Sequence, residues 1–155
     1  MKIKLIAVGT KMPAWVTEGF KEYQRRMPAE MSVQLIEVPL SIRGKNCDIA
    51  KAINKESDQI LEHLKSSDQV VALEVKGKPW STEKLAQELE GWQMNGGDVA
   101  LLIGGPDGLS DACRQRANQL WSLSPLTLPH PLVRVLLAEQ VYRAWSINRN
   151  HPYHR

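Results

Sequence analysis

One short segment of this chain limits its fold more than any other. Residues 99–103 read Val-Ala-Leu-Leu-Ile and lead directly into a glycine-rich loop, Gly-Gly-Pro-Asp-Gly, at residues 104–108. An uninterrupted apolar run of strand length is typical of a central parallel strand that is buried on both faces. Helices must then cover both faces of the sheet, so the segment predicts an α/β protein with a mainly parallel sheet.

Further apolar runs of strand length alternate with helical patterns along the chain. No proline-rich or low-complexity stretch divides them, and the length of 155 residues and the hydrophobic fraction of 43% are ordinary for one domain. We therefore expect a single domain over residues 1–155. The remaining predicted strands cover residues 3–8, 33–38, 70–75 and 120–123, with a turn at residues 77–79.

Capping residues and helix breakers predict where the helices begin. Asn46, Ser81 and Ser110 each precede a helical pattern, and their side chains are suited to cap it. In the helix after Asn46 we expect Ile49 to face the core. Pro131 suits the start of the last helix, which we expect over residues 132–148.

The positive charge is concentrated at the C-terminal end. The formal net charge is +3, and from residue 130 onward four arginines stand against one glutamate, so the rest of the chain is neutral overall. An acidic partner would suit this segment, and a solvated helix face is an equally good interpretation.

Targeting and cysteine signals are weak. No apolar run has the length of a membrane span, and the first residues have a strand pattern rather than that of a signal peptide, so we expect a cytoplasmic protein without a membrane partner. Cys47 and Cys113 are too few for a disulfide framework or a structural zinc site, and we expect both to be buried.

The common catalytic motifs are missing from the sequence. It contains no GxGxxG fingerprint, no P-loop, no GxSxG elbow and no HExxH pair, and its histidines suggest no metal site. A reaction that depends on proximity and orientation fits this inventory better than covalent or metal catalysis. The glycine loop and the proline-stiffened segment at residues 123–128 could present backbone groups to a ligand such as an adenine ring. An ordinary turn and a buried crossover are the alternatives.

Three segments together resemble one family. They are the strand and glycine loop at residues 101–108, Leu-Ser-Pro-Leu-Thr-Leu-Pro-His at residues 123–130, and the tail Asn-His-Pro-Tyr-His-Arg at residues 150–155. In this order and spacing the whole chain resembles the RlmH-type methyltransferases of the SPOUT class. The resemblance implies a SPOUT-type fold with a C-terminal trefoil knot, a homodimer, and S-adenosylmethionine-dependent methylation of N3 of a pseudouridine in large-subunit (23S) ribosomal RNA of the assembled ribosome.

The resemblance also implies where the cofactor binds. S-adenosylmethionine would lie between the end of the third strand, the glycine loop and residues 123–128. The implied cofactor-binding residues are Leu73, Gly104, Gly105, Leu123, Ser124, Pro125, Leu126, Thr127 and Leu128.

The implied reaction needs a ring nitrogen to lose its proton, so a general base or a group that stabilises negative charge would help. The candidates for catalysis are His154, Tyr153 and Arg143, in the tail and the helix before it. In a dimer, the tail of one subunit could complete the pocket of the other. Tyr153 could instead tether the chain end, and Arg134 and Arg149 are expected to meet phosphates.

A wider surface could contact the RNA, and other functions are compatible with the sequence. His130 follows the crossover, and we expect it to act mainly as a helix-start residue. A ribosome-docking protein without catalysis and an enzyme for transfer RNA are the alternatives, and cofactor binding separates the first from the methyltransferase. The further RNA contacts that we expect are Lys11, Arg25, Arg26, Arg43 and Lys45.

Overall fold

The protein is an α/β fold built on one parallel sheet. The computed structural model describes residues 1–46 and 48–155, and within them five strands form the sheet in the order β2-β1-β4-β3-β5, with every neighbouring pair parallel. The central strand β4 is buried along its whole length, as its sequence predicts. The strands are β1 (Lys2–Val8), β2 (Ser32–Val38), β3 (Gln69–Pro79), β4 (Val99–Ile103) and β5 (Gln119–Ser122).

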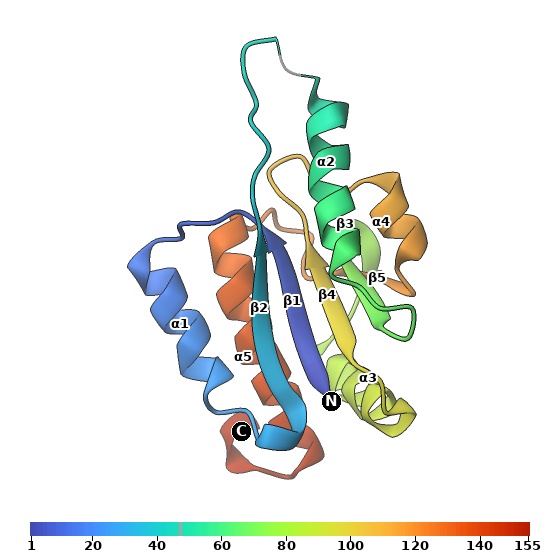
Figure 1. Cartoon of the computed structure of the whole chain (residues 1–155). Coiled ribbons are helices and arrows are strands. Elements are labelled where there is room, and N and C mark those ends of the chain that lie inside the picture. Colours follow the sequence, from blue (N-terminus) through green and yellow to red (C-terminus); the bar gives the residue numbers. More distant parts are fainter. Residues whose placement is uncertain (47) are drawn as a thin grey trace.

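Helices cover both faces of the sheet (Figure 1). The side chains of α1, α3 and α5 share a core with one face, and those of α2 and α4 share a smaller core with the other. The helices are α1 (Ala14–Gln24), α2 (Ile49–Glu62), α3 (Thr82–Asn95), α4 (Asp111–Arg116) and α5 (His130–Asn148), and short 3₁₀ turns occur at Ala29–Met31 and Pro152–His154.

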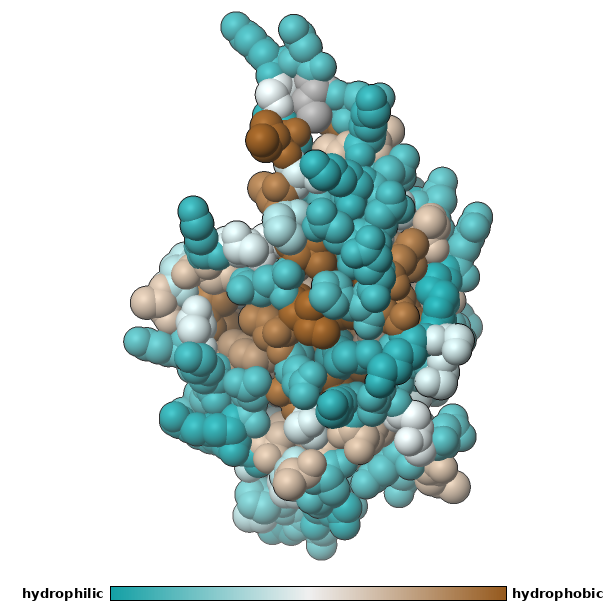
Figure 2. Space-filling model, viewed as in Figure 1, coloured by the Kyte–Doolittle hydropathy of each residue, from teal (hydrophilic) through white to brown (hydrophobic). Residues whose placement is uncertain are grey.

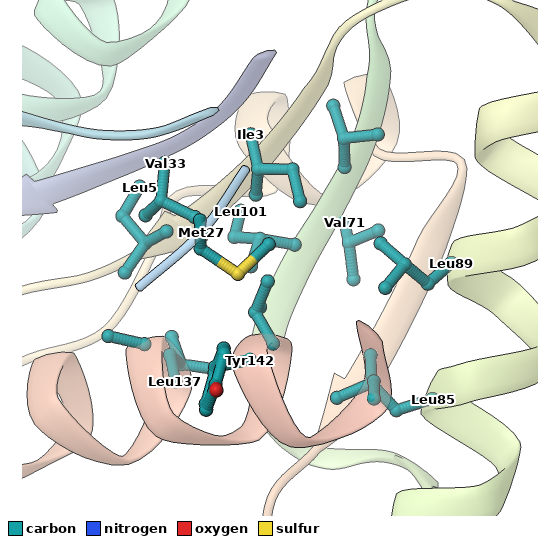
Figure 3. Packing of buried hydrophobic residues seen from close by; sticks show 14 of the residues in the cluster. Ile3, Leu5, Met27, Val33, Val71, Leu85, Leu89, Leu101, Leu137 and Tyr142 are labelled. Carbon is teal, nitrogen blue, oxygen red and sulfur yellow. The ribbon is translucent and has the colours of Figure 1, made fainter. Parts of the chain in front are cut away.

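The larger core lies between the sheet and helices α3 and α5. In Figure 3, Leu85 and Leu89 of α3 and Leu137 of α5 surround Val71 and Leu101 of the sheet. Burial of each such side chain contributes about 1.5–3 kcal/mol relative to an exposed one. This packing holds α5 against the sheet. The helix begins near the carboxyl ends of the strands and ends at the opposite side of the molecule, next to the C-terminus.

Two of the three predicted helix caps are confirmed. The hydroxyl groups of Ser81 and Ser110 accept hydrogen bonds from backbone N–H groups in the first turns of α3 and α4. The prediction for Asn46 is wrong, because Asp48 caps α2 by accepting from the N–H group of Lys51. The helix therefore begins later than predicted, and Ile49, expected in the core, is 52% exposed in its first turn.

Strand β3 is longer than predicted. Residues 77–79, expected to form a turn, continue the strand, and after an irregularity its last residues pair with β5. A Cβ atom on Gly77 would lie 2.7 Å from the carbonyl carbon of Leu120, so the close approach of the two backbones requires glycine. The extension brings β5 and the following segment to the end of β3.

The carboxyl ends of the strands gather at the top of Figure 1, where the chain also extends as a loop between β2 and α2. Figure 2 shows a largely polar surface with apolar atoms on this loop, where Leu40 and Ile42 are exposed. Cys113 is buried as predicted, and Cys47 lies outside the described residues.

Candidate functional site

A cavity opens at the carboxyl edge of the sheet, between the ends of β3, β4 and β5 and the start of α5. The space between these elements measures about 730 Å³, a figure that includes open solvent at its mouth. Ligands bind at this edge in open α/β sheets. Of the residues predicted to bind the cofactor, those that line it are Leu73, Gly104, Gly105, Leu123, Ser124, Leu126 and Leu128.

The two other predicted residues, Pro125 and Thr127, are exposed and are not part of this lining. The residues of this segment that line the cavity are alternate ones, Ser124, Leu126 and Leu128. The hydroxyl group of Ser124 accepts a hydrogen bond from the backbone N–H of Leu126, at 2.9 Å, and this bond stabilises the curved path of the segment.

The glycine loop folds back on itself so closely that Gly104 has no room for a side chain. A Cβ atom there would lie 2.6 Å from the carbonyl carbon of Gly108, well inside any real contact distance. The backbone N–H of Gly108 donates to the carbonyl of Gly105 at 3.0 Å, and Gly108 has a φ of +83°. The loop therefore needs glycine at position 104, where two backbone segments touch, and favours it at position 108, where φ is positive.

Arg43 ties this loop to the neighbouring β2–α2 loop. Its guanidinium group lies 2.7 Å from the carboxylate of Asp107 in the glycine loop and 2.7 Å from that of Glu56, which is almost completely buried in α2. Hydrogen bonds to Glu56 and Asp107 raise the pKa of Arg43 above its ordinary value. Both carboxylates compensate the charge of Arg43, and its contact with RNA stays a prediction.

A second group of contacts holds the loop from the side of α5. The ring nitrogen Nδ1 of His130 lies 2.9 Å from the carbonyl oxygen of Gly104, and its Nε2 lies 3.2 Å from the guanidinium group of Arg134. Burial, and then the charge of Arg134, lower the pKa of His130. His130 is therefore both the first residue of α5 and a group of the cavity, beyond the helix-start role expected for it.

The prediction that Arg134 meets phosphates is wrong. Its side chain is completely buried, with a hydrogen bond to the carbonyl of Gly9 at 2.8 Å and an ion pair with Glu37 at 2.7 Å. Arginine is rarely buried unless it is paired, so an exposed side chain was the natural expectation. The one local signal of its contact with His130 is the spacing of four residues, which places both side chains on the same helix face.

The three residues predicted to take part in catalysis lie close together at the other end of α5. The phenol of Tyr153 donates to the carboxylate of Glu139 at 3.0 Å, and Arg143 binds the same carboxylate at 2.7 Å. The guanidinium carbon of Arg143 lies 4.9 Å from the centre of the Tyr153 ring. The Nδ1 atom of His154, in the same 3₁₀ turn as Tyr153, is buried with no hydrogen-bond partner among the described residues.

The tail is packed against the body of the protein by aromatic contacts. The Tyr153 ring lies 4.6 Å from that of Tyr142 in α5 and 6.5 Å from that of Tyr23 in α1. Burial, and then hydrogen bonds with Tyr23 and Glu139, raise the pKa of Tyr153 above its ordinary value. In this arrangement Tyr153 is a neutral phenol that can donate a hydrogen bond but cannot accept a proton from a substrate.

The cavity and the tail lie at opposite ends of the molecule. Helix α5 starts at the cavity with His130 and has 19 residues, which at 1.5 Å per residue span about 28 Å before the tail begins. Figure 1 shows the C-terminus at the bottom of the view and the carboxyl edge of the sheet at the top. Within one chain, these two sets of predicted site residues do not form a single site.

The remaining contacts bear on the other predicted classes of partner. Arg25 and Arg26 are both paired with Glu22 on α1, and His63 is exposed on the surface. No group of three metal-ligating side chains is placed to hold an ion in residues 1–46 and 48–155. None of the helices in the same ranges has the length and hydropathy of a bilayer-spanning segment.

Comparison with known proteins identifies the family. The family model described as "Predicted SPOUT methyltransferase" matches residues 1–154. A protein of Hahella chejuensis named ribosomal RNA large subunit methyltransferase H is 66% identical over 155 residues, covering 100% of this chain and 99% of the relative. A protein of the same name from a Marinomonas species is 60% identical and is covered completely, as is this chain. The chain belongs to the SPOUT methyltransferase family.

Proposed function

We propose that this protein is a methyltransferase of large-subunit ribosomal RNA, which uses S-adenosylmethionine to methylate N3 of a pseudouridine in the assembled ribosome. The observation that carries the proposal is the cavity at the carboxyl edge, where the tightly folded glycine loop faces the leucine-rich segment. Membership of the SPOUT family supports the reaction class, and the printed names of the two relatives support the RNA. In this proposal residues 1–155 form one SPOUT methyltransferase domain whose C-terminal part is a trefoil knot. The protein would act in the cytoplasm.

The cavity is suited to this methyl donor by shape and by charge. S-adenosylmethionine would bring an activated methyl group on a sulfonium, with a positive charge and no phosphate. The described residues that line the cavity include no lysine or arginine, and their one carboxylate, Glu74, is paired with Arg114 at 3.2 Å. Leu73, Leu126 and Leu128 offer apolar surface for an adenine ring, while the loop at Gly104 presents backbone rather than side chains. A phosphate-bearing cofactor would find no cation to bind there.

The tail provides the groups that a ring nitrogen needs. Because the pKa of Tyr153 is raised, its phenol keeps its proton and would orient the ring of the pseudouridine by hydrogen bonding. Arg143 supplies positive charge that could stabilise the deprotonated ring. His154 is then the candidate for the general base, since imidazole is the side chain most often used in that role. The in-line transfer itself depends on the proximity and orientation of donor and acceptor, which these groups would help to set.

A homodimer would bring the two ends together. The length of α5 separates the cavity from the tail of the same chain by about 28 Å, far more than a methyl transfer allows. If both take part in one reaction, the tail must come from a second copy. We therefore propose that each active site combines the cavity of one subunit with residues 153–155 of its partner.

The central experiment measures transfer of labelled methyl groups from S-adenosylmethionine to assembled ribosomes, with free ribosomal RNA and transfer RNA in parallel. We expect label in large-subunit RNA of the assembled particle alone. Label in transfer RNA would refute the proposal that large-subunit ribosomal RNA is the substrate. Absence of donor binding would favour a docking protein without catalysis.

Co-expression of two inactive chains tests the composite site. One chain carries Gly104→Trp and has an intact tail, and the other lacks residues 153–155 and has an intact cavity. If the tail acts on the partner's cavity, the mixed dimer regains one complete site and recovers activity. If the tail acts within its own chain, every site in the mixture is damaged and no activity returns. Each chain expressed alone is the matched control.

A further inference from the structure

Arg134 is completely buried where the carboxyl ends of three strands meet. Its guanidinium group binds the carbonyl of Gly9, directly after β1, at 2.8 Å, and the carboxylate of Glu37, near the end of β2, at 2.7 Å. It also contacts His130, which reaches the loop after β4. A buried cation is costly unless its donors are satisfied, so this set of acceptors fixes the side chain in one position.

These contacts leave His130 only one possible arrangement of its hydrogens. Arg134 has donors and no acceptor, so the Nε2 atom of His130, 3.2 Å away, must accept. The carbonyl oxygen of Gly104 can only accept, so the Nδ1 atom, 2.9 Å away, must carry the hydrogen. The ring is thus neutral, with its hydrogen on Nδ1. Burial and the charge of Arg134 both lower the pKa of His130 and favour the same neutral form.

The hydrogen bond from His130 fixes a peptide plane of the cavity. Because a peptide unit is planar, holding the carbonyl of Gly104 also fixes the direction of the N–H group of Gly105. Both glycines line the cavity, and neither has a side chain that could anchor it. Besides the bond within the loop from Gly108 to Gly105, the loop is held by partners outside it, and His130 reaches the Gly104 carbonyl.

We propose that Arg134 and His130 are positioning residues of the methyl-donor cavity: Arg134 keeps His130 in the neutral form with its hydrogen on Nδ1, and His130 sets the orientation of the Gly104–Gly105 peptide. The nature of the ligand rests on the proposed function, whereas the arrangement of the two side chains does not. Glu37 completes the network by pairing with Arg134 from β2.

Two variants of His130 separate the hydrogen bond from the volume of the ring. The side-chain amide of His130→Asn can donate to the Gly104 carbonyl from nearly the place of Nδ1, whereas His130→Leu fills similar space without a donor. We expect His130→Leu to weaken S-adenosylmethionine binding about tenfold in calorimetry, since one buried carbonyl loses its partner. His130→Asn should retain most of the affinity. Equal binding by wild type and His130→Leu would overturn the inference.

Nuclear magnetic resonance of the protein without donor provides an independent test. The ¹⁵N shifts of His130 should show a neutral ring protonated at Nδ1 at neutral pH, and a ring protonated at Nε2 would refute the arrangement. In Arg134→Met the titration of His130 should move to higher pH, because a neighbouring positive charge is lost. An unchanged titration would show that Arg134 does not act on His130.

Amide exchange of the glycine loop separates this inference from the proposed function. The N–H group of Gly108, bonded to the carbonyl of Gly105, should exchange faster in His130→Leu than in His130→Asn. If wild-type protein binds no methyl donor, the proposed function fails, and this comparison still decides whether His130 positions the loop. Equal exchange in the two variants would refute the positioning role.

Discussion

Adding a single methyl group to Gly104 should damage the cavity without unfolding the protein. In Gly104→Ala the new Cβ would lie 2.6 Å from the carbonyl carbon of Gly108, whereas ordinary contacts begin at 3.4 Å. The two arms of the loop must therefore separate by about 0.8 Å, which would stretch the 3.0 Å bond between Gly108 and Gly105 beyond hydrogen-bond range. Overpacking of this kind costs about 1–3 kcal/mol, or about 5- to 150-fold in donor affinity if the cost falls on the bound loop.

The assay is isothermal titration with S-adenosylmethionine, accompanied by denaturant unfolding and by size-exclusion chromatography. Gly91→Ala is the matched control, because the same methyl group added to Gly91, within α3, meets nothing within 4 Å. That variant should bind normally and gain up to about 1 kcal/mol in stability, since alanine favours the helix. If Gly104→Ala binds the donor as tightly as Gly91→Ala does, the packing of the glycine loop does not shape the binding site.

Three further predictions concern stability. Gly77→Ala should lower the free energy of unfolding by about 1–3 kcal/mol and speed amide exchange in β5, because its Cβ would lie 2.7 Å from the carbonyl carbon of Leu120; unchanged exchange would contradict this. Lys4→Met should cost about 3–5 kcal/mol in denaturant unfolding, since it leaves the buried carboxylate of Asp68, 2.7 Å away, without its cation; a loss below 1 kcal/mol would count against the pair. Because the pKa of His130 is lowered in the folded protein, the unfolded chain binds more protons below about pH 6.5. The free energy of unfolding should therefore fall more steeply on acidification in wild type than in His130→Asn, and parallel slopes would refute it.

Local signals in the sequence predicted most of the fold. The strand at residues 99–103 was recognisable because a run of apolar residues needs no information about its partners. The caps at Ser81 and Ser110 were recognisable because the hydroxyl group bonds to a backbone N–H only three residues away. At α2 the same kind of signal led to the wrong residue, because Asn46 was predicted and Asp48, two positions later, is the cap.

Features that depend on distant partners could not be predicted. The pattern at residues 77–79 is typical of a turn, and the strand continues there because the backbone of Leu120 lies against Gly77. Arg134 has the sequence context of a surface residue, and its burial depends on Glu37 and Gly9, 97 and 125 positions away. Neither interaction leaves a periodic or compositional trace.

The two parts of the candidate site, the cavity and the tail, also differ in how far the sequence could predict them. The strand ends indicated the edge of the sheet where the cavity lies, and the resemblance to the SPOUT family supplied its individual residues. The catalytic proposal was less accessible, because Tyr153 and Arg143 meet at Glu139, and their shared carboxylate becomes visible only when the tail is folded against α5. The separation of tail and cavity follows from the length of α5, which the sequence did predict closely.

The order of strands in the sheet has a consequence for biosynthesis. Because β1 pairs with β4, the register joins Ile3 to Val99, and β1 can gain only its β2 neighbour until β4 has left the ribosome. Within residues 1–46 and 48–155 every strand pair of the sheet is parallel, so these strands offer no hairpin as an early nucleus. Until β4 has emerged, the edges of β1 and β3 that pair with it stay exposed, and chaperones would be needed during this period. Pulse-labelled nascent chains should become resistant to protease only after residue 103 has emerged.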